Sequence, residues 1–244
     1  MKITISNKIK NKYPSIPLKE IEQFQLEYKK RQYYSIESKI DGKDFARNVL
    51  MFLFCTLQRS YSLYKGAINS LNNRDVIVSY LAARAHMEST GSIAYCLIQL
   101  EKYYKGEISF DQIDSYLYKL HLGRKYYSED TDYPEIIDTI GVMTLIDSVD
   151  KVYFKSMDKK HKKMFRNTYE WLSEFCHPNH FGQIIGVIQE GKKAVFNYNH
   201  FPDKDEVQHF FFSLISSCHL LFPMYDNCFA LINEHETMPE ICTS

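Results

Sequence analysis

Apolar residues recur at helical spacing along most of the chain and predict a series of helices. The run from Val49 to Leu57 is apolar on nearly every side, which is typical of a helix at the centre of a protein. Glycine, proline or paired asparagines separate the periodic stretches. Helices are therefore expected over residues 18–40, 44–71, 75–105, 109–123, from 134 onward, 159–176 and 203–234.

Two short β-prone runs, 184–189 and 194–198, interrupt this helical pattern. The turn Glu190-Gly191-Lys192-Lys193 joins them, and two such runs around a glycine predict a β-hairpin. The sequence has no repeat period and no low-complexity linker. We therefore expect a mainly α fold: a multi-helix bundle with one short β-hairpin near residues 184–198. We expect one domain over 1–244, in which the N-terminal residues 1–16 need not pack on the bundle.

Composition and charge narrow the class of protein. The 244 residues carry 30 basic and 30 acidic side chains, a balance that argues against wholesale phosphate binding. The six cysteines form no C-x-x-C pair, and most lie in apolar runs, so we expect reduced, buried thiols in a cytoplasmic protein. The uncharged run Phe210 to Tyr225 is shorter than the ~20 residues of a membrane span, and Pro223 and Asp226 interrupt it. We expect core helices and no membrane contact.

The segment from Arg166 to Gly182 concentrates polar chemistry at the end of a predicted helix. At 100° per residue, Arg166, Tyr169 and Ser173 share one side of that helix. His177 precedes Pro178, which favours extended backbone, so the helix is expected to end there with the imidazole able to turn back onto the polar side. The alternative is a histidine that only caps the last carbonyl groups of the helix.

A second polar feature is the pair Arg84 and Glu88, four residues apart on an apolar helix rich in small residues. A charged pair in such a setting is expected to be partly buried and to need partners. One interpretation is an ion pair within the helix that fixes its register. The other joins the pair to the helix end, as an internal polar cluster of five candidate catalytic residues: His177, Arg84, Glu88, Ser173 and Tyr169.

Metal and nucleic-acid binding are weaker hypotheses. The spacing Glu174-x-x-His177 occurs in di-iron bundles, but those need two such motifs and two further glutamates that all face one helical core, a full ligand set that we do not expect here. We therefore expect no metal site and no cofactor. A basic run precedes the polar segment and is either a solvated helix face or a contact for RNA or a nucleotide. Its candidate binding residues are Lys159, Lys160, Lys162, Lys163 and Arg166.

The run Tyr169 to Asn179, with Arg84-x-x-x-Glu88 upstream, resembles a pattern in uncharacterised bacterial helical proteins. In those proteins a Y-x-x-L-S-x-x-x-H-P helix end is followed by glycine and a short hairpin. A more distant resemblance is to the HEPN group of helical ribonucleases and nucleotide-binding proteins. Their motif places an arginine four to six residues before a histidine at a helix end, and both act on the RNA backbone, commonly across a dimer. Here Leu172-Ser173 occupies that arginine position.

Three hypotheses follow, and the sequence leaves open whether the protein is an enzyme. The first is a binding or regulatory protein whose polar cluster is structural. The second is a HEPN-like, metal-independent ribonuclease with His177 as acid and base and Arg84 or Arg166 on the phosphate. The third is a metalloenzyme around Glu174, His177 and Glu88. A homodimer and an RNA or nucleotide partner are consistent with the resemblance.

Overall fold

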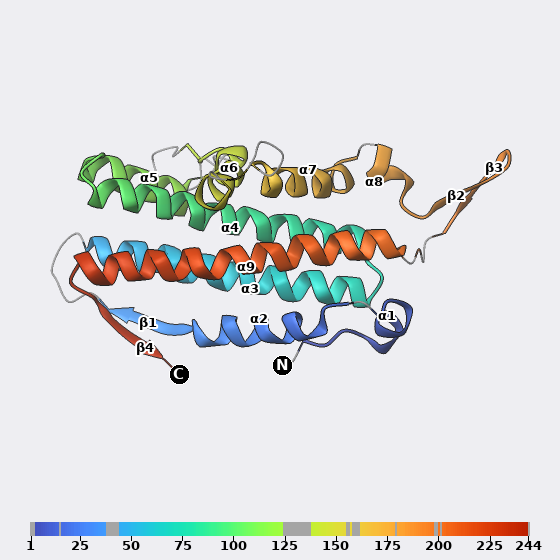
Figure 1. Ribbon diagram of the computed structural model, residues 1–244, viewed down its shortest axis with the longest axis horizontal. Helices are drawn as coiled ribbons and strands as arrows, with labels where there is room; N and C mark the ends of the chain where they lie inside the picture. Colours follow the sequence, from blue (N-terminus) through green and yellow to red (C-terminus); the bar gives the residue numbers. More distant parts are fainter. Residues whose placement is uncertain are drawn as a thin grey trace, which may run out of the picture.

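The computed structural model describes residues 3–14, 16–37, 44–123, 138–154, 157, 162–178, 180–197, 200 and 202–243. Three long helices run side by side along the molecule and form its central layer: α3 (Phe45–Asn72), α4 (Val76–Tyr104) and α9 (Lys204–His235). Other elements cover this layer from above and below (Figure 1). The fold is mainly α, with only short two-stranded sheets in the described chain, which confirms the predicted class.

Capping side chains begin α3 and α9 where the sequence predicts, whereas Asp75 precedes α4 without a side-chain cap hydrogen bond. The carboxylate of Asp44 accepts the main-chain N–H of Arg47 at the start of α3. Asp203 and Glu206 form a reciprocal capping box at the start of α9. These side chains satisfy N–H groups that have no partner within the helix. Pro223 lies inside α9 without ending it, in agreement with the helix predicted over 203–234. Buried residues on both sides of it hold the helix together against a cost of about 3 kcal/mol.

The upper layer consists of α5 (Phe110–Leu122), α6 (Val142–Tyr153), α7 (Met164–Cys176) and α8 (His180–Ile184). Helix α6 begins at Val142 after non-helical residues 138–141, and the predicted start at Pro134 lies outside the described residues. Both α6 and α7 pack on α4. At Gly91 of α4 the backbone of Leu145 approaches so closely that a β-carbon would lie 2.8 Å from its carbonyl. The small-residue pattern of α4 therefore lets α6 pack tightly.

The lower layer contains α1 (Asn7–Lys12), α2 (Leu18–Lys30) and an antiparallel pair of strands, β1 (Tyr33–Glu37) and β4 (Glu240–Thr243). The predicted helix 18–40 is therefore too long, because its last third contains the aromatic and β-branched residues of β1. Residues 3–14, which were allowed to be loose, are packed instead. Ile3, Ile5 and Ile9 are buried, and the amide of Gln25 bonds the N–H and the carbonyl of Ile3.

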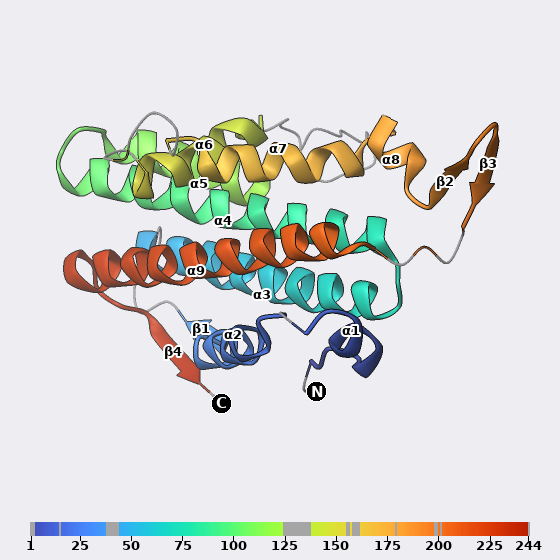
Figure 2. The ribbon, with the colours of Figure 1, turned by 45° about the vertical axis from the view of Figure 1, so that its right-hand side comes forward.

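The predicted hairpin forms from β2 (Val187–Glu190) and β3 (Lys193–Phe196) around Gly191, which has φ +60°. It protrudes from the end of the bundle as an arm (Figures 1 and 2). Helix α9 is long and apolar enough to cross a membrane, and 56% of its most apolar window is buried inside the fold, as in a core helix. The expectation of buried thiols is wrong for Cys55 and Cys242, which are exposed.

Candidate functional site

The predicted meeting of α4 and α7 occurs through three side chains. Arg84 Nη2 donates to the hydroxyl of Tyr169 over 2.7 Å, and that hydroxyl donates to Glu88 Oε1 over 2.9 Å. The guanidinium also lies over the Tyr169 ring at 5.0 Å, and Nη2 is 3.7 Å from Glu88 Oε1. The spacing of four residues places Arg84 and Glu88 on the same face of α4, and Tyr169 bridges them from α7. We call these three residues the polar cluster.

Burial and neighbouring charges shift the pKa values of Arg84 and Tyr169. Burial disfavours the charged guanidinium, but the hydrogen bond to Tyr169 and the charge of Glu88 outweigh it and raise the pKa of Arg84. Burial, followed by Glu88, raises the pKa of Tyr169 to about 12. Burial also raises the pKa of the neighbouring Cys176 thiol to about 11, although Arg84 partly opposes this. Tyr169 therefore keeps its phenolic proton at neutral pH, and the neighbouring Cys176 remains a thiol.

Ser173 and His177 do not join the polar cluster. The hydroxyl of Ser173 donates to the main-chain carbonyl of Tyr169 over 2.8 Å, one turn back along α7. His177 ends α7 in extended backbone, with φ −97° and ψ 153°, as its position before proline predicts. Its side chain is exposed, and within the described chain it makes no hydrogen bond to Arg84 or Glu88. The histidine thus ends α7 as an exposed residue, outside the contacts of Arg84, Glu88 and Tyr169.

Acidic side chains neutralise the last residue of the basic run 159–166, Arg166. Arg166 forms ion pairs with Asp147 at 3.0 Å and with Glu170 at 2.9 Å. Lys162 and Lys163 are exposed just before α7, and Lys159 and Lys160 lie outside the described residues. Arg166 is therefore held along the protein surface by two carboxylates, as on a solvated helix face, the first of the two alternatives for this run.

The residues of the metalloenzyme hypothesis are not gathered at one point. Among the residues that the structure describes, no three His, Cys, Asp or Glu side chains are grouped so that they could hold a metal ion. Glu88 bonds Tyr169 in the polar cluster, whereas His177 is exposed at the end of α7. The di-iron spacing from Glu174 to His177 therefore does not correspond to a ligand set in the described chain.

A buried hydrogen-bonded chain, which sequence reasoning missed, crosses the core from α2 to α9. The phenol of Tyr28 bonds His86 Nε2, and His86 Nδ1 bonds the hydroxyl of Ser217 over 2.8 Å. Ser217 in turn bonds Thr90 Oγ1 over 2.8 Å. Burial lowers the pKa of His86 to about 3, with a smaller effect from the charge of Arg59. The sequence does show a histidine in the middle of an apolar helix, but it does not show that Tyr28 and Ser217, its partners, come from two other helices.

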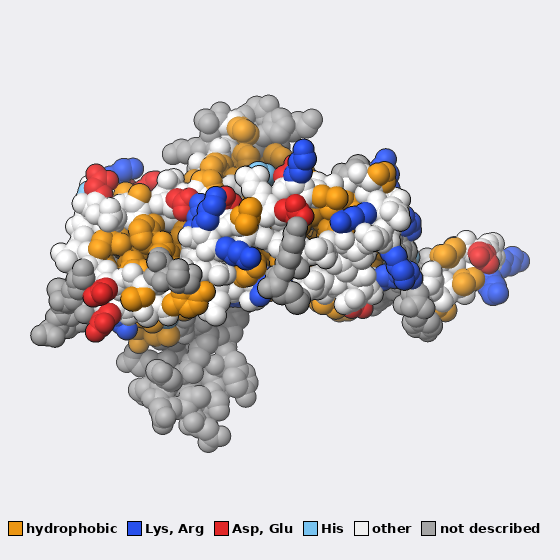
Figure 3. All heavy atoms as spheres, turned by 90° about the horizontal axis from the view of Figure 1, so that it is seen from below, with side chains coloured by type: hydrophobic (Ala, Val, Ile, Leu, Met, Phe, Trp, Pro, Cys, Tyr) orange, Lys and Arg blue, Asp and Glu red, His pale blue; other side chains and the backbone are white. Residues whose placement is uncertain are grey.

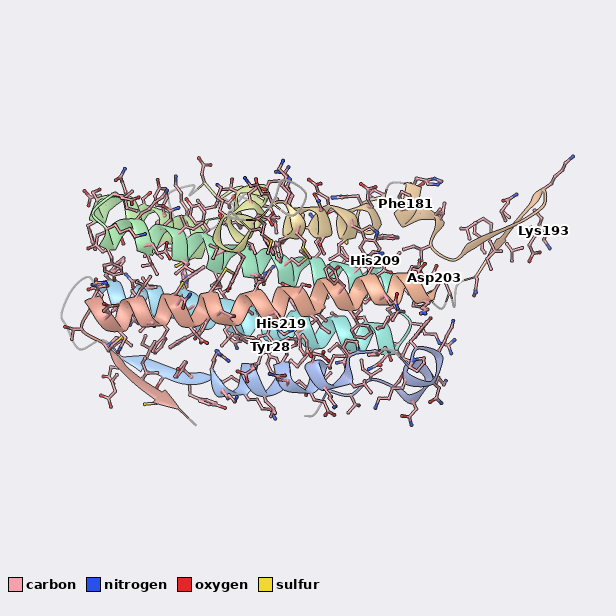
Figure 4. The ribbon with its side chains drawn as sticks, viewed as in Figure 1. Tyr28, Phe181, Lys193, Asp203, His209 and His219 are labelled. Carbon is pink, nitrogen blue, oxygen red and sulfur yellow. The ribbon has the colours of Figure 1, made fainter. Side chains whose placement is uncertain are left out.

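Tyr28 is also at the floor of a groove, the second feature that the sequence did not predict. In Figure 4 it points from α2 toward α9, near His219. The groove has a volume of about 480 Å³, which is in the range of small-molecule sites. One wall is the end of α2 and the start of β1, including Arg31 and Tyr34. The other wall is one face of α3: Phe54, Cys55, Gln58, Tyr61, Ser62 and Lys65. We call it the tyrosine groove.

Comparisons with family models, curated proteins and solved structures gave no match to this chain. The likeness to the uncharacterised helical proteins and to the HEPN group therefore stays a resemblance of motif. The structural features that bear on function are the polar cluster, the buried chain and the tyrosine groove.

Proposed function

We propose that the protein is a binding protein that holds a small molecule in the tyrosine groove. The observation that carries this proposal is the composition of the groove. Its aromatic surface comes from Phe54, Tyr33, Tyr34 and Tyr61 above the buried Tyr28, while hydrogen-bonding groups at its walls come from Gln32, Gln58 and Ser62. Small-molecule sites combine mainly aromatic or apolar surface with a few polar groups that orient the ligand. The buried chain below Tyr28 fixes the floor of the groove.

The polar cluster has a structural role in this proposal. Its only cation, Arg84, already faces Glu88 and the hydroxyl of Tyr169, so little positive charge is left for a phosphate. These contacts fix the orientation of α7 on α4, because one side chain of α7 bonds two side chains of α4 that lie 81 and 85 residues away in sequence. The interaction of the two helices is thus specified by polar contacts as well as by packing.

Ligand-observed NMR tests the binding function with a mixture of small aromatic fragments: phenol, indole, adenine and benzoate. Ser62 is exposed on the groove wall, so Ser62→Trp should fill the groove without disturbing the core. Asn69→Trp is the matched control on the same helix, at an exposed position outside the groove. We expect fragment binding to the wild type and to Asn69→Trp, and loss of binding in Ser62→Trp. Equal binding by all three proteins, or by none, would contradict the proposal.

Cleavage of labelled, structured RNA with and without EDTA separates this proposal from the catalytic hypotheses. We expect no cleavage by the folded wild type. EDTA-resistant cleavage that disappears in His177→Ala would replace the binding function with a ribonuclease. Cleavage or bound metal that EDTA removes, and that Glu174→Gln abolishes, would instead support the metalloenzyme.

A further inference from the structure

The tyrosine groove arranges its groups in a definite order along α3. Phe54 stacks on Tyr33 at 4.5 Å, and seven residues later Tyr61 packs on Tyr28 at 5.0 Å. Seven residues of helix advance by about 10 Å, so two aromatic surfaces lie roughly that far apart along one wall. Gln58 lies on the same wall between them. This spacing suits a flat ring system held between aromatic side chains.

A positive charge lies one turn beyond the second aromatic surface. Lys65 Nζ is 4.5 Å from the centre of the Tyr61 ring. Within the described chain, that ring is the contact found for the ammonium group of Lys65, and no carboxylate pairs with it. Three N–H donors are therefore available to a ligand group at this end of the groove.

The other cation of the groove, Arg31, is already neutralised. Its guanidinium forms a bidentate pair with both oxygens of Asp226, at 2.7 and 2.5 Å, and also bonds Glu27 at 2.7 Å. It also lies over the ring of Phe222 at 4.8 Å. Arg31 therefore serves as a fixed part of the wall, and Lys65 is the open charge.

The sign of these charges decides what class of ligand fits. Aromatic side chains also attract cations, so a groove lined by tyrosines first suggests a cationic ligand. However, Arg31 is already paired with two carboxylates, and the other charged side chain among the described residues of the groove, Lys65, is positive and already covers Tyr61. A cationic ligand would be repelled at the position where it would have to stack.

We propose, building on the binding function above, that the tyrosine groove takes a planar aromatic ring that carries a negative charge. The ring lies between the Phe54–Tyr33 and Tyr61–Tyr28 surfaces, and the anionic group bonds the ammonium of Lys65. A phosphate or a carboxylate supplies the same contact. In Figure 3, which views the molecule from the α2 side, hydrophobic side chains with tyrosines included gather toward the end that carries β1 and β4.

Two pairs of ligands that differ in charge test this inference by calorimetry on the full chain. The pairs are AMP with adenosine, and indole-3-acetate with indole-3-acetamide; they distinguish a phosphate from a carboxylate. In at least one pair we expect the anion to bind about tenfold more tightly, the size of a charge-assisted hydrogen bond. Lys65→Gln should remove the difference, and Lys65→Arg should keep it. Lys29→Gln, an exposed lysine of α2 outside the groove, should leave it unchanged.

Alkylation of the exposed cysteines locates the ligand. Cys55 lines the groove and Cys242 lies outside it on β4, so a bound ligand should slow modification of Cys55 alone. Equal affinity for anions and neutral partners, or no effect of Lys65→Gln, overturns the inference. If neutral fragments still bind and Ser62→Trp blocks them, the binding function stands while the proposed ligand class falls. Protection of both cysteines, or of neither, also overturns it.

Discussion

The phenol of Tyr28 lies 2.5 Å from Nε2 of His86, and this contact connects the tyrosine groove to the centre of the bundle. Because burial keeps His86 neutral, one ring nitrogen accepts and the other donates. Burial raises the pKa of Tyr28 well above the usual value, so the phenol keeps its proton and can donate it to Nε2. In that arrangement Nδ1 carries the ring proton and donates to Ser217, and the hydroxyl of Thr90 returns the chain to the carbonyl of His86.

The neutral state of His86 predicts acid sensitivity. In the unfolded chain it takes up a proton near pH 6.5, whereas in the folded protein it does so only near pH 3. Between these values the unfolded state binds more protons, so the stability due to His86 is present above pH 6.5 and is lost as the pH falls below it. We expect His86 to contribute a loss of about 1.4 kcal/mol per pH unit in this range. Denaturant unfolding at several pH values measures it.

His86→Leu cannot titrate, so its stability should fall less steeply with acid than that of the wild type, although it starts lower. The control is His219→Gln, which changes an exposed histidine packed edge-on against Phe24. That variant should keep the wild-type slope. If His86→Leu and the wild type lose stability in parallel from pH 6.5 to 4.5, His86 is not held neutral.

The polar cluster makes its own prediction about stability. Tyr169→Phe keeps the ring under the guanidinium of Arg84 but removes the hydroxyl that bridges Arg84 and Glu88. Two hydrogen bonds to charged groups are lost, and the expected cost is about 1–3 kcal/mol of unfolding free energy. Binding in the tyrosine groove should not change, because the hydroxyl lies between α4 and α7. Tyr34→Phe, at a 69% exposed position, is the control for stability and should cost little.

Close packing of α4 and α6 predicts opposite effects for two glycine substitutions. Gly91→Ala places a methyl group 2.8 Å from the backbone of Leu145, and backbone atoms cannot move aside as a flexible side chain would. We expect a loss of about 1–3 kcal/mol. Gly66→Ala on α3 meets nothing within 4 Å and should stabilise the helix by about 0.5–1 kcal/mol. Thermal unfolding of both variants checks this contrast, and destabilisation by both would contradict it.

Features set by neighbouring residues could be predicted from the sequence, and features set by distant ones could not. The Asp44 and Asp203 caps, the hairpin turn at Gly191 and the end of α7 before Pro178 follow from local chemistry. The pairing of β1 with β4 joins segments some two hundred residues apart, and no local pattern encodes it.

The candidate sites divide in the same way. Arg84 and Glu88 share a helix, so their common face was predictable, and Tyr169 was found because its own helix has a polar side. The tyrosine groove depends on how the end of α2 and the start of β1 lie against α3. The sequence predicts a helix where Tyr33 and Tyr34 form strand β1. Because the start of β1 belongs to one wall of the groove, the groove could not be predicted from a helix at these residues.

The start of α7 provides a last test, because two nearby aspartates act on it in different ways. Asp150 is buried, and its carboxylate accepts the main-chain N–H groups of Phe165 at 2.9 Å and Arg166 at 3.1 Å. It therefore caps a helix from a neighbouring element, and Asp150→Ala should cost about 1–2 kcal/mol and speed hydrogen exchange in the first turn of α7. Asp147 instead pairs with the Arg166 side chain at the surface, so Asp147→Ala should change stability far less. An equal loss in both variants would mean that the ion pair, and not the cap, fixes the start of α7.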